Sequence, residues 1–287
     1  MIKIKALCAS VALAASCVTA LFPAAAQPEV LAPVEEPRDL NGIWAVMNAA
    51  NYDLEAHPAR AAMQMREGPV IPVPAAEVEA LGAVGSVPGW ESVVTTNDGD
   101  IPYTEEARAE KERRQANWLS EDPEIKCYLP GVPRATYQGL PFQIVQSADS
   151  MLIAYSYANT VRNIELEDPG EAPLDSWMGQ SYGHWEGDTL VVEVTAQNGQ
   201  TWLDRSGNHM SNMGKVTERY TKISPFHMHY SATIEDPETF TEPWTMEMIL
   251  YKDVRPEAKL YEFNCVEFVE ELMYGHLRKE PLDPVEE

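Results

Sequence analysis

The feature that most limits the fold of this chain is a series of short segments rich in β-branched and aromatic residues. Turn residues separate the segments, and this pattern is typical of antiparallel strands. The sequence predicts about nine strands, at residues 42–44, 142–146, 151–157, 161–166, 189–195, 215–223, 226–234, 244–251 and 259–264. Because a closed sheet leaves no strand edge exposed, we expect a mainly β fold, an antiparallel meander closed into a barrel.

Two helices are expected outside the strands. Thr104 can cap a surface helix, since Glu105 and Glu106 suit its positive end and no helix breaker follows before Asp122. Residues 266–277 place apolar side chains at helical spacing, which predicts a C-terminal helix packed on the barrel. Several prolines between residues 48 and 100 predict an irregular insertion instead.

The N-terminus has the pattern of a secretory signal peptide over residues 1–26. Two lysines precede an apolar run, and small residues end at Ala26, where we expect cleavage. A membrane anchor or a lipoprotein signal at Cys17 is the alternative, but polar residues interrupt the run and the residues after Cys17 are apolar. We therefore expect a periplasmic or secreted protein, with a flexible lead-in at 27–38 and a single barrel domain at 39–287.

Cysteine content and charge bear on redox state and on partners. Cleavage would leave Cys127 and Cys265, and an even pair in an exported chain predicts a disulfide. The alternative, reactive or metal-bound thiols, lacks a Cys-x-x-Cys or His-rich spacing. The formal net charge of −24 repels phosphate and anionic lipid, so we expect neither nucleic-acid nor membrane-surface binding.

Longer motifs resemble those of a family of exported bacterial proteins of unassigned function. They are CYLPGVPR at 127–134, WMGQSYGHWEGDTLVV at 177–192, TWLD at 201–204, ERY at 218–220 and TIEDP at 233–237, followed by PWT at 243–245. The resemblance covers about residues 100–280 and implies no particular chemistry. Family members tend to have a histidine directly before the serine of the loop after TWLD, whereas here Met210 precedes Ser211 and His209 stands one place earlier. Gly42-x-Trp44 also has a faint similarity to lipocalin-like barrels.

Histidines offer the first candidates for chemistry. Gly187-Asp188 has the composition of a tight hairpin turn, so these two residues need no functional explanation. His184 and Trp185 then lie near the end of a strand. His227 and His229 alternate along one strand and could begin a metal site. Apolar residues occupy the other face of that strand, however, so we expect both imidazoles to face solvent and predict no metal site.

Three further residues pose questions that depend on their surroundings. Asp204 lies in a Gly- and Asn-rich loop and could orient His184 or His209 as a general base, or simply cap a turn. Arg162 within a strand is either a surface cation or an inward anchor for a carboxylate or enolate. Glu218 faces inward in one strand register and outward in the other.

These observations support three hypotheses about function, none of which requires a cofactor. The first is a barrel that binds a small apolar or aromatic molecule, with Arg162 as its charged group; its walls would come from Trp44, Tyr155, Trp185, Trp202 and Trp244. The alternative is a cofactor-free acid–base enzyme, such as a lyase, hydratase, isomerase or cyclase, that uses Asp204, His184, Glu218 and His209 in the same cavity. The third is an envelope interaction module that exposes residues 48–100.

Overall fold

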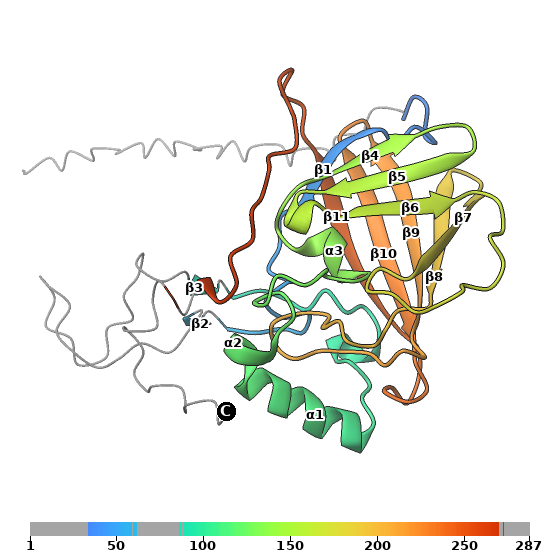
Figure 1. Ribbon diagram of the computed structural model, residues 1–287. Helices are drawn as coiled ribbons and strands as arrows, with labels where there is room; N and C mark the ends of the chain where they lie inside the picture. Colours follow the sequence, from blue (N-terminus) through green and yellow to red (C-terminus); the bar gives the residue numbers. More distant parts are fainter. Residues whose placement is uncertain (1–33, 59, 62–85, 88, 270–271, 273–287) are drawn as a thin grey trace, which may run out of the picture. The chain divides into compact units, whose positions relative to one another are not determined.

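A computed structural model describes residues 34–58, 60–61, 86–87, 89–269 and 272. Nine strands form a closed barrel in the order β1-β11-β10-β9-β8-β7-β6-β5-β4, in which β1 pairs with both β11 and β4 (Figure 1). The barrel strands are β1 (Gly42–Val46), β4 (Phe142–Gln146), β5 (Ser150–Tyr155), β6 (Val161–Glu165), β7 (Gln180–Glu186), β8 (Thr189–Thr195), β9 (Lys215–Ser224), β10 (His227–Glu235) and β11 (Trp244–Lys252). The expected mainly β barrel is therefore confirmed.

Two details of the expected strand series are wrong. Residues 259–264 are irregular, and β7 takes the ninth place in the barrel instead. Because β1 already joins β11 to β4, the closed sheet offers no edge to a later strand. The meander is also interrupted, since β6 and β7 pair in parallel while every other neighbouring pair in the barrel is antiparallel.

Alternation along the strands sorts side chains between the barrel interior and its outer face. On β9, Val216, Glu218 and Tyr220 are buried and point inward, and on β10 the buried Met228 and Tyr230 do the same. The inward apolar side chains of all the strands join one hydrophobic cluster. The register question at Glu218 is thereby resolved, and this carboxylate lies inside the barrel.

Helices and short elements complete the described chain. The N-cap of α1 (Glu105–Ala116) is Thr104, whose hydroxyl accepts from the Ala107 amide, as expected. The remaining elements are α2 (Trp118–Glu121), α3 (Arg134–Tyr137), the 3-10 turns η1 (Asn97–Gly99) and η2 (Tyr157–Asn159), and the short strands β2 (Arg60–Ala61) and β3 (Ser86–Val87). All four residues of α3 are buried beside the barrel.

The expected disulfide between Cys127 and Cys265 is present. The C-terminal helix expected at 266–277 lies largely outside the described residues, and of its apolar side chains Val266, Val269 and Leu272 are exposed. The expected signal peptide lies entirely outside them. Within the described part of the chain, no helix is both long and apolar enough to cross a membrane.

The described flanks of the 48–100 insertion pack onto the barrel. Ala50, Leu54, Val93 and Val94 belong to the hydrophobic cluster, and the amide of Thr95 donates to the carbonyl of Thr245 on β11. These flanks therefore do not form the exposed apolar surface that the interaction-module hypothesis requires. Residues 62–85 of the insertion lie outside the described part of the chain.

Candidate functional site

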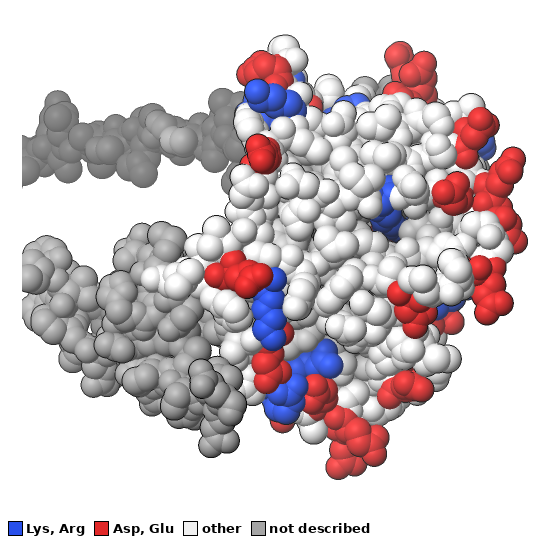
Figure 2. All heavy atoms as spheres, in the orientation of Figure 1, with Lys and Arg blue, Asp and Glu red and all other residues white. Residues whose placement is uncertain are grey.

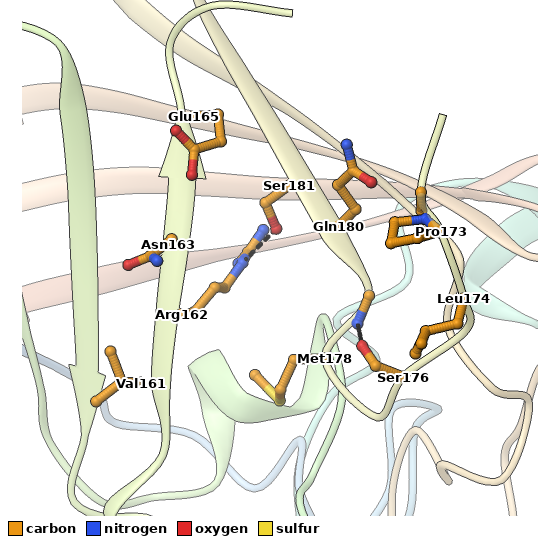
Figure 3. Close-up of a pocket in the computed structure, with 12 residues that line it drawn as sticks. Val161, Arg162, Asn163, Glu165, Pro173, Leu174, Ser176, Met178, Gln180 and Ser181 are labelled. Carbon is orange, nitrogen blue, oxygen red and sulfur yellow. Dashed lines mark hydrogen bonds between the residues drawn. The ribbon is translucent and has the colours of Figure 1, made fainter. Parts of the chain in front are cut away.

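The barrel has one weakly paired seam, between β6 and β7. One residue pair, Glu165 with Tyr182, joins these strands, whereas seven pairs join β7 to β8. From this pair toward their N-terminal ends the two strands diverge, and a cavity of about 350 Å³ lies between them (Figure 3). We call it the seam cavity. Its lining residues are Val161, Arg162, Asn163, Glu165, Ala172, Pro173, Leu174, Ser176, Met178, Gly179, Gln180 and Ser181.

The local sequence explains why the barrel opens here. Residues 166–179 connect β6 to β7 and contain two prolines and two glycines, so they form a long irregular link. A parallel pair needs a link of roughly a dozen residues or more, which a hairpin turn cannot provide. Part of the same link, including Pro173 and Leu174, forms one wall of the seam cavity.

The seam cavity has an apolar wall and a buried polar end. Val161 and Leu174 are exposed at its mouth, while Arg162, Ser181 and Met178 are buried at its inner end. In Figure 2 a basic side chain is recessed in an otherwise uncharged part of the surface, at the position that β6 occupies in Figure 1. A few polar groups within an apolar concave site are typical of small-molecule pockets.

Arg162 is held rigidly at this inner end. Its Nε donates to Ser181 Oγ on β7 at 2.8 Å, and its Nη2 forms an ion pair with Glu218 Oε2 on β9 (Figure 3 shows the bond to Ser181). The other carboxylate oxygen, Oε1, accepts from the hydroxyls of Tyr220 at 2.9 Å and Tyr230 at 2.8 Å. These bonds join four strands, β6, β7, β9 and β10, across the barrel interior and fix the plane of the guanidinium.

Electrostatics keep this network in a defined protonation state. Burial opposes the charge on Arg162, but the Glu218 carboxylate holds the pKa of Arg162 well above its usual value. Burial, and then the Glu218 charge, raise the pKa values of Tyr220 and Tyr230 well above the usual value. At neutral pH the site therefore contains one cation and two neutral phenols around Glu218.

The predicted wall residues occupy different parts of the molecule. Tyr155 lies inside the barrel on β5, and neither it nor any of the four named tryptophans is among the residues that line the seam cavity. Trp44 and Trp244 are fully buried in the barrel interior. Trp185 packs on the core with the Arg38 guanidinium 5.5 Å from its ring, and Trp202 lies in a loop with Arg114 at 5.6 Å. A single cavity walled by all these aromatic residues is not present among the described residues.

The predicted acid–base residues do not converge on one point. Ser181 and Gly183 are buried on β7, so His184 between Gly183 and Trp185 points outward, where its Nε2 lies 3.4 Å from Glu186 Oε1. Glu218 is instead inside the barrel, bonded to Arg162. The set proposed for acid–base catalysis therefore does not share a cavity.

Asp204 acts as the anchor of its loop. Its Oδ2 accepts from the Leu54 amide at 2.8 Å, and its Oδ1 accepts from the amides of Ser206 at 2.8 Å and Asn208 at 3.2 Å. The side-chain amide of Asn208 donates to Oδ2 as well. These bonds fit the turn-capping interpretation of Asp204 rather than the general-base interpretation.

His209 lines a second cavity, of about 430 Å³, beside α1. Its Nδ1 lies 3.1 Å from the Gly207 carbonyl oxygen, and its ring stacks on Tyr103. Burial and the Arg114 charge lower the pKa of His209 to about 4, so the imidazole is neutral at pH 7. No direct hydrogen bond joins Asp204 to His209 among the described residues. A chain of hydrogen bonds connects them instead, from Asp204 to Asn208, from Asn208 to the Tyr103 hydroxyl, and from that hydroxyl to the His209 amide.

The two strand histidines lie on the outer face of β10, as expected, although both are half-buried rather than fully exposed. His227 Nδ1 is 2.7 Å from Ser224 Oγ, and His229 Nε2 is 3.1 Å from Glu247 Oε2. Within the described ranges, no group of three or more histidine, cysteine or acidic side chains is placed to hold a metal ion.

Several residues of the seam cavity were missed by the sequence analysis. Met178 and Ser181 lie within the motif at 177–192 but were not singled out, and Leu174 lies outside every motif; the role of all three depends on the gap between β6 and β7. The length of the 166–179 link was the one available signal, because it exceeds a hairpin turn and allows a parallel pair. In comparisons with known proteins, no family model matches this chain, and no curated protein matches it either.

Proposed function

We propose that this protein binds a small, largely apolar or aromatic molecule in the seam cavity. The observation that carries the proposal is Arg162, a charged side chain that is only 3% exposed yet lines the inner end of a cavity with apolar walls. A buried guanidinium fixed by Glu218 and Ser181 is a preorganised donor group. The wall residues Val161, Leu174 and Met178 offer apolar contacts to the rest of the ligand.

The position of the catalytic candidates favours binding over catalysis. Acid–base catalysis needs titratable groups within hydrogen-bond reach of a common point. His184 lies outside the barrel, and Asp204 is occupied by loop amides. Binding requires only shape and a few polar contacts, which the seam cavity provides.

We further propose that the protein is exported to the periplasm or beyond, after cleavage behind Ala26. The signal-like pattern of residues 1–26 and the Cys127–Cys265 disulfide support this location, since disulfides persist in oxidising compartments. Membership of the exported bacterial family suggested by the CYLPGVPR and WEGDTLVV motifs is part of the same proposal. Intact-mass analysis of periplasmic and whole-cell fractions tests it: a mature chain that begins at Gln27 supports export, and a full-length cytoplasmic chain contradicts it.

Native mass spectrometry of protein isolated from its own cells tests ligand binding. We expect a non-covalent adduct of small mass on the wild type and its loss from the double variant Arg162→Met/Glu218→Gln, which removes the cation together with its counter-charge. Arg114→Met is the matched control, because Arg114 lines the second cavity and not the seam cavity. Circular dichroism verifies that all variants are folded.

Two results would contradict the proposal. One is a wild-type protein that carries no adduct. The other is an adduct that survives in the double variant but disappears in Arg114→Met, because the ligand would then occupy the cavity beside α1.

A further inference from the structure

Three of the buried side-chain donors that have no hydrogen-bond partner among the described residues lie near one another, in and beside the barrel. They are Arg162 Nη1, the Tyr155 hydroxyl and the Thr136 hydroxyl. Their side chains come from β6, β5 and α3, and each residue is less than 5% exposed. Isolated unpaired groups such as Trp244 Nε1 also occur in the core, but three such donors grouped beside a cavity indicate a recognition site.

The strand register places two of these donors, those of Arg162 and Tyr155, near each other. Arg162 pairs with Ile153 across β5 and β6, and Tyr155 lies two residues further along the same inner face of β5. Such diagonal neighbours are within reach of long side chains. Burial raises the pKa of Tyr155, and the Arg162 charge and polar interactions with Arg162 and Thr136 partly oppose that increase. The three groups therefore lie near one another, although no pair of them meets hydrogen-bond geometry.

The unpaired nitrogen belongs to the guanidinium at the inner end of the seam cavity. Ser181 and Glu218 occupy Nε and Nη2, so Nη1 remains for another acceptor. Met178 shares this inner end with Arg162 (Figure 3). Because an unbranched thioether side chain changes rotamer easily, a ligand in the cavity can displace it and approach the donors.

Charge balance decides which acceptor fits these donors. Glu218 already neutralises Arg162 within the enclosed barrel, and Tyr155 and Thr136 are neutral hydroxyl groups. A ligand carboxylate would add a second buried anion without a second cation, which is strongly unfavourable. A neutral carbonyl oxygen accepts hydrogen bonds without this penalty.

We propose that the ligand of the seam cavity carries a neutral carbonyl group, such as a ketone, ester or amide, whose oxygen is bound by Arg162, Tyr155 and Thr136. This inference rests on the proposed binding function and names the chemical class of its ligand. The apolar or aromatic part of the ligand would lie against Val161, Leu174 and Met178.

Three fluorinated probes of matched shape test the inference by ¹⁹F NMR titration. They are 4-fluoroacetophenone, its alkene isostere 4-fluoro-α-methylstyrene, and 4-fluorobenzoate. We expect the ketone to bind roughly tenfold more tightly than the alkene, because only the ketone oxygen can accept a hydrogen bond from the charged guanidinium. Tyr155→Phe and Thr136→Val each remove one hydroxyl and should reduce this ratio to about threefold while alkene affinity changes little.

Tyr103→Phe is the control variant, because it removes a buried hydroxyl bonded to Asn208, away from the three donors. It should leave the ketone-to-alkene ratio unchanged. Equal affinity for ketone and alkene in the wild type would overturn the carbonyl inference while leaving small-molecule binding in place. Tighter binding of the benzoate than of the ketone would assign the site to anions and overturn it as well. If none of the three probes binds, the proposed binding function itself fails.

Discussion

The ion pair between Arg162 and Glu218 gives the sharpest test of the barrel interior. Both side chains are almost completely buried, and they connect β6 to β9 across the barrel. Removing one partner of a buried pair leaves an uncompensated charge and costs about 3–5 kcal/mol of unfolding free energy. Removing both together avoids that penalty.

The hydrogen bonds around the pair determine how much unfolding free energy each variant loses. In Arg162→Met the carboxylate keeps the Tyr220 and Tyr230 hydroxyls, so we expect a loss near 3 kcal/mol. In Glu218→Gln the guanidinium keeps Ser181 but loses its counter-charge, so the loss should approach about 5 kcal/mol. The double variant is neutral, and its Gln oxygen can still accept from both tyrosines, so we expect a loss of only about 1–3 kcal/mol.

Urea unfolding with the disulfide intact measures these values. The midpoint should shift while the slope with urea stays constant, and the double-mutant cycle should give a coupling energy of at least about 3 kcal/mol. Additive effects, or single variants that each cost less than about 1 kcal/mol, would refute the buried pair as described. Such values are typical of exposed ion pairs.

Three other perturbations give further predictions. Cys127→Ala/Cys265→Ala should lower the free energy of unfolding by about 5 kcal/mol, because the bridge spans 138 residues, and a thermal midpoint unchanged from the oxidised wild type would contradict this. The pKa of His209 is lowered to about 4, so wild-type stability should fall as pH drops from about 6.5 to 4, and His209→Gln should flatten that dependence in urea midpoints. Burial opposes the charge of Glu124, but Arg205 and Arg134 lower its pKa to about 2, so stability should also fall from about pH 4.5 toward 2. In Glu124→Gln, unfolding followed by circular dichroism should show no loss of stability between about pH 4.5 and 2, and the variant should be less stable than the wild type at pH 7. If the variant still loses stability steeply in this pH range, another group is responsible for acid unfolding.

Much of the barrel could be predicted from the sequence because strand signals are local. β4 and β8 have the expected bounds, and the turn at Gly187 has the expected positive φ. The inward-facing residues of β9 could also have been predicted, since Lys215, Thr217, Arg219 and Thr221 make the opposite face of this strand polar as far as Thr221. The disulfide followed from the even pair of cysteines that remains after the expected signal peptide.

The candidate site could be predicted only in part, because it depends on contacts between distant strands. Arg162 was left open between a surface cation and an inward anchor, and its partner Glu218, 56 residues away, was considered separately. Trp202 was expected in a cavity wall on composition alone, yet its loop places it beside Arg114. The three unpaired donors depend on α3 and on strand register, and neither leaves a local sequence signal.

A crystal structure with 4-fluoroacetophenone bound tests the central claim most directly. The account predicts ligand density between β6 and β7, with the ring against Leu174 and Met178 and the carbonyl oxygen within hydrogen-bond distance of Arg162. Density confined to the cavity beside α1, or to the outer surface, while the gap between β6 and β7 holds only solvent, would contradict it.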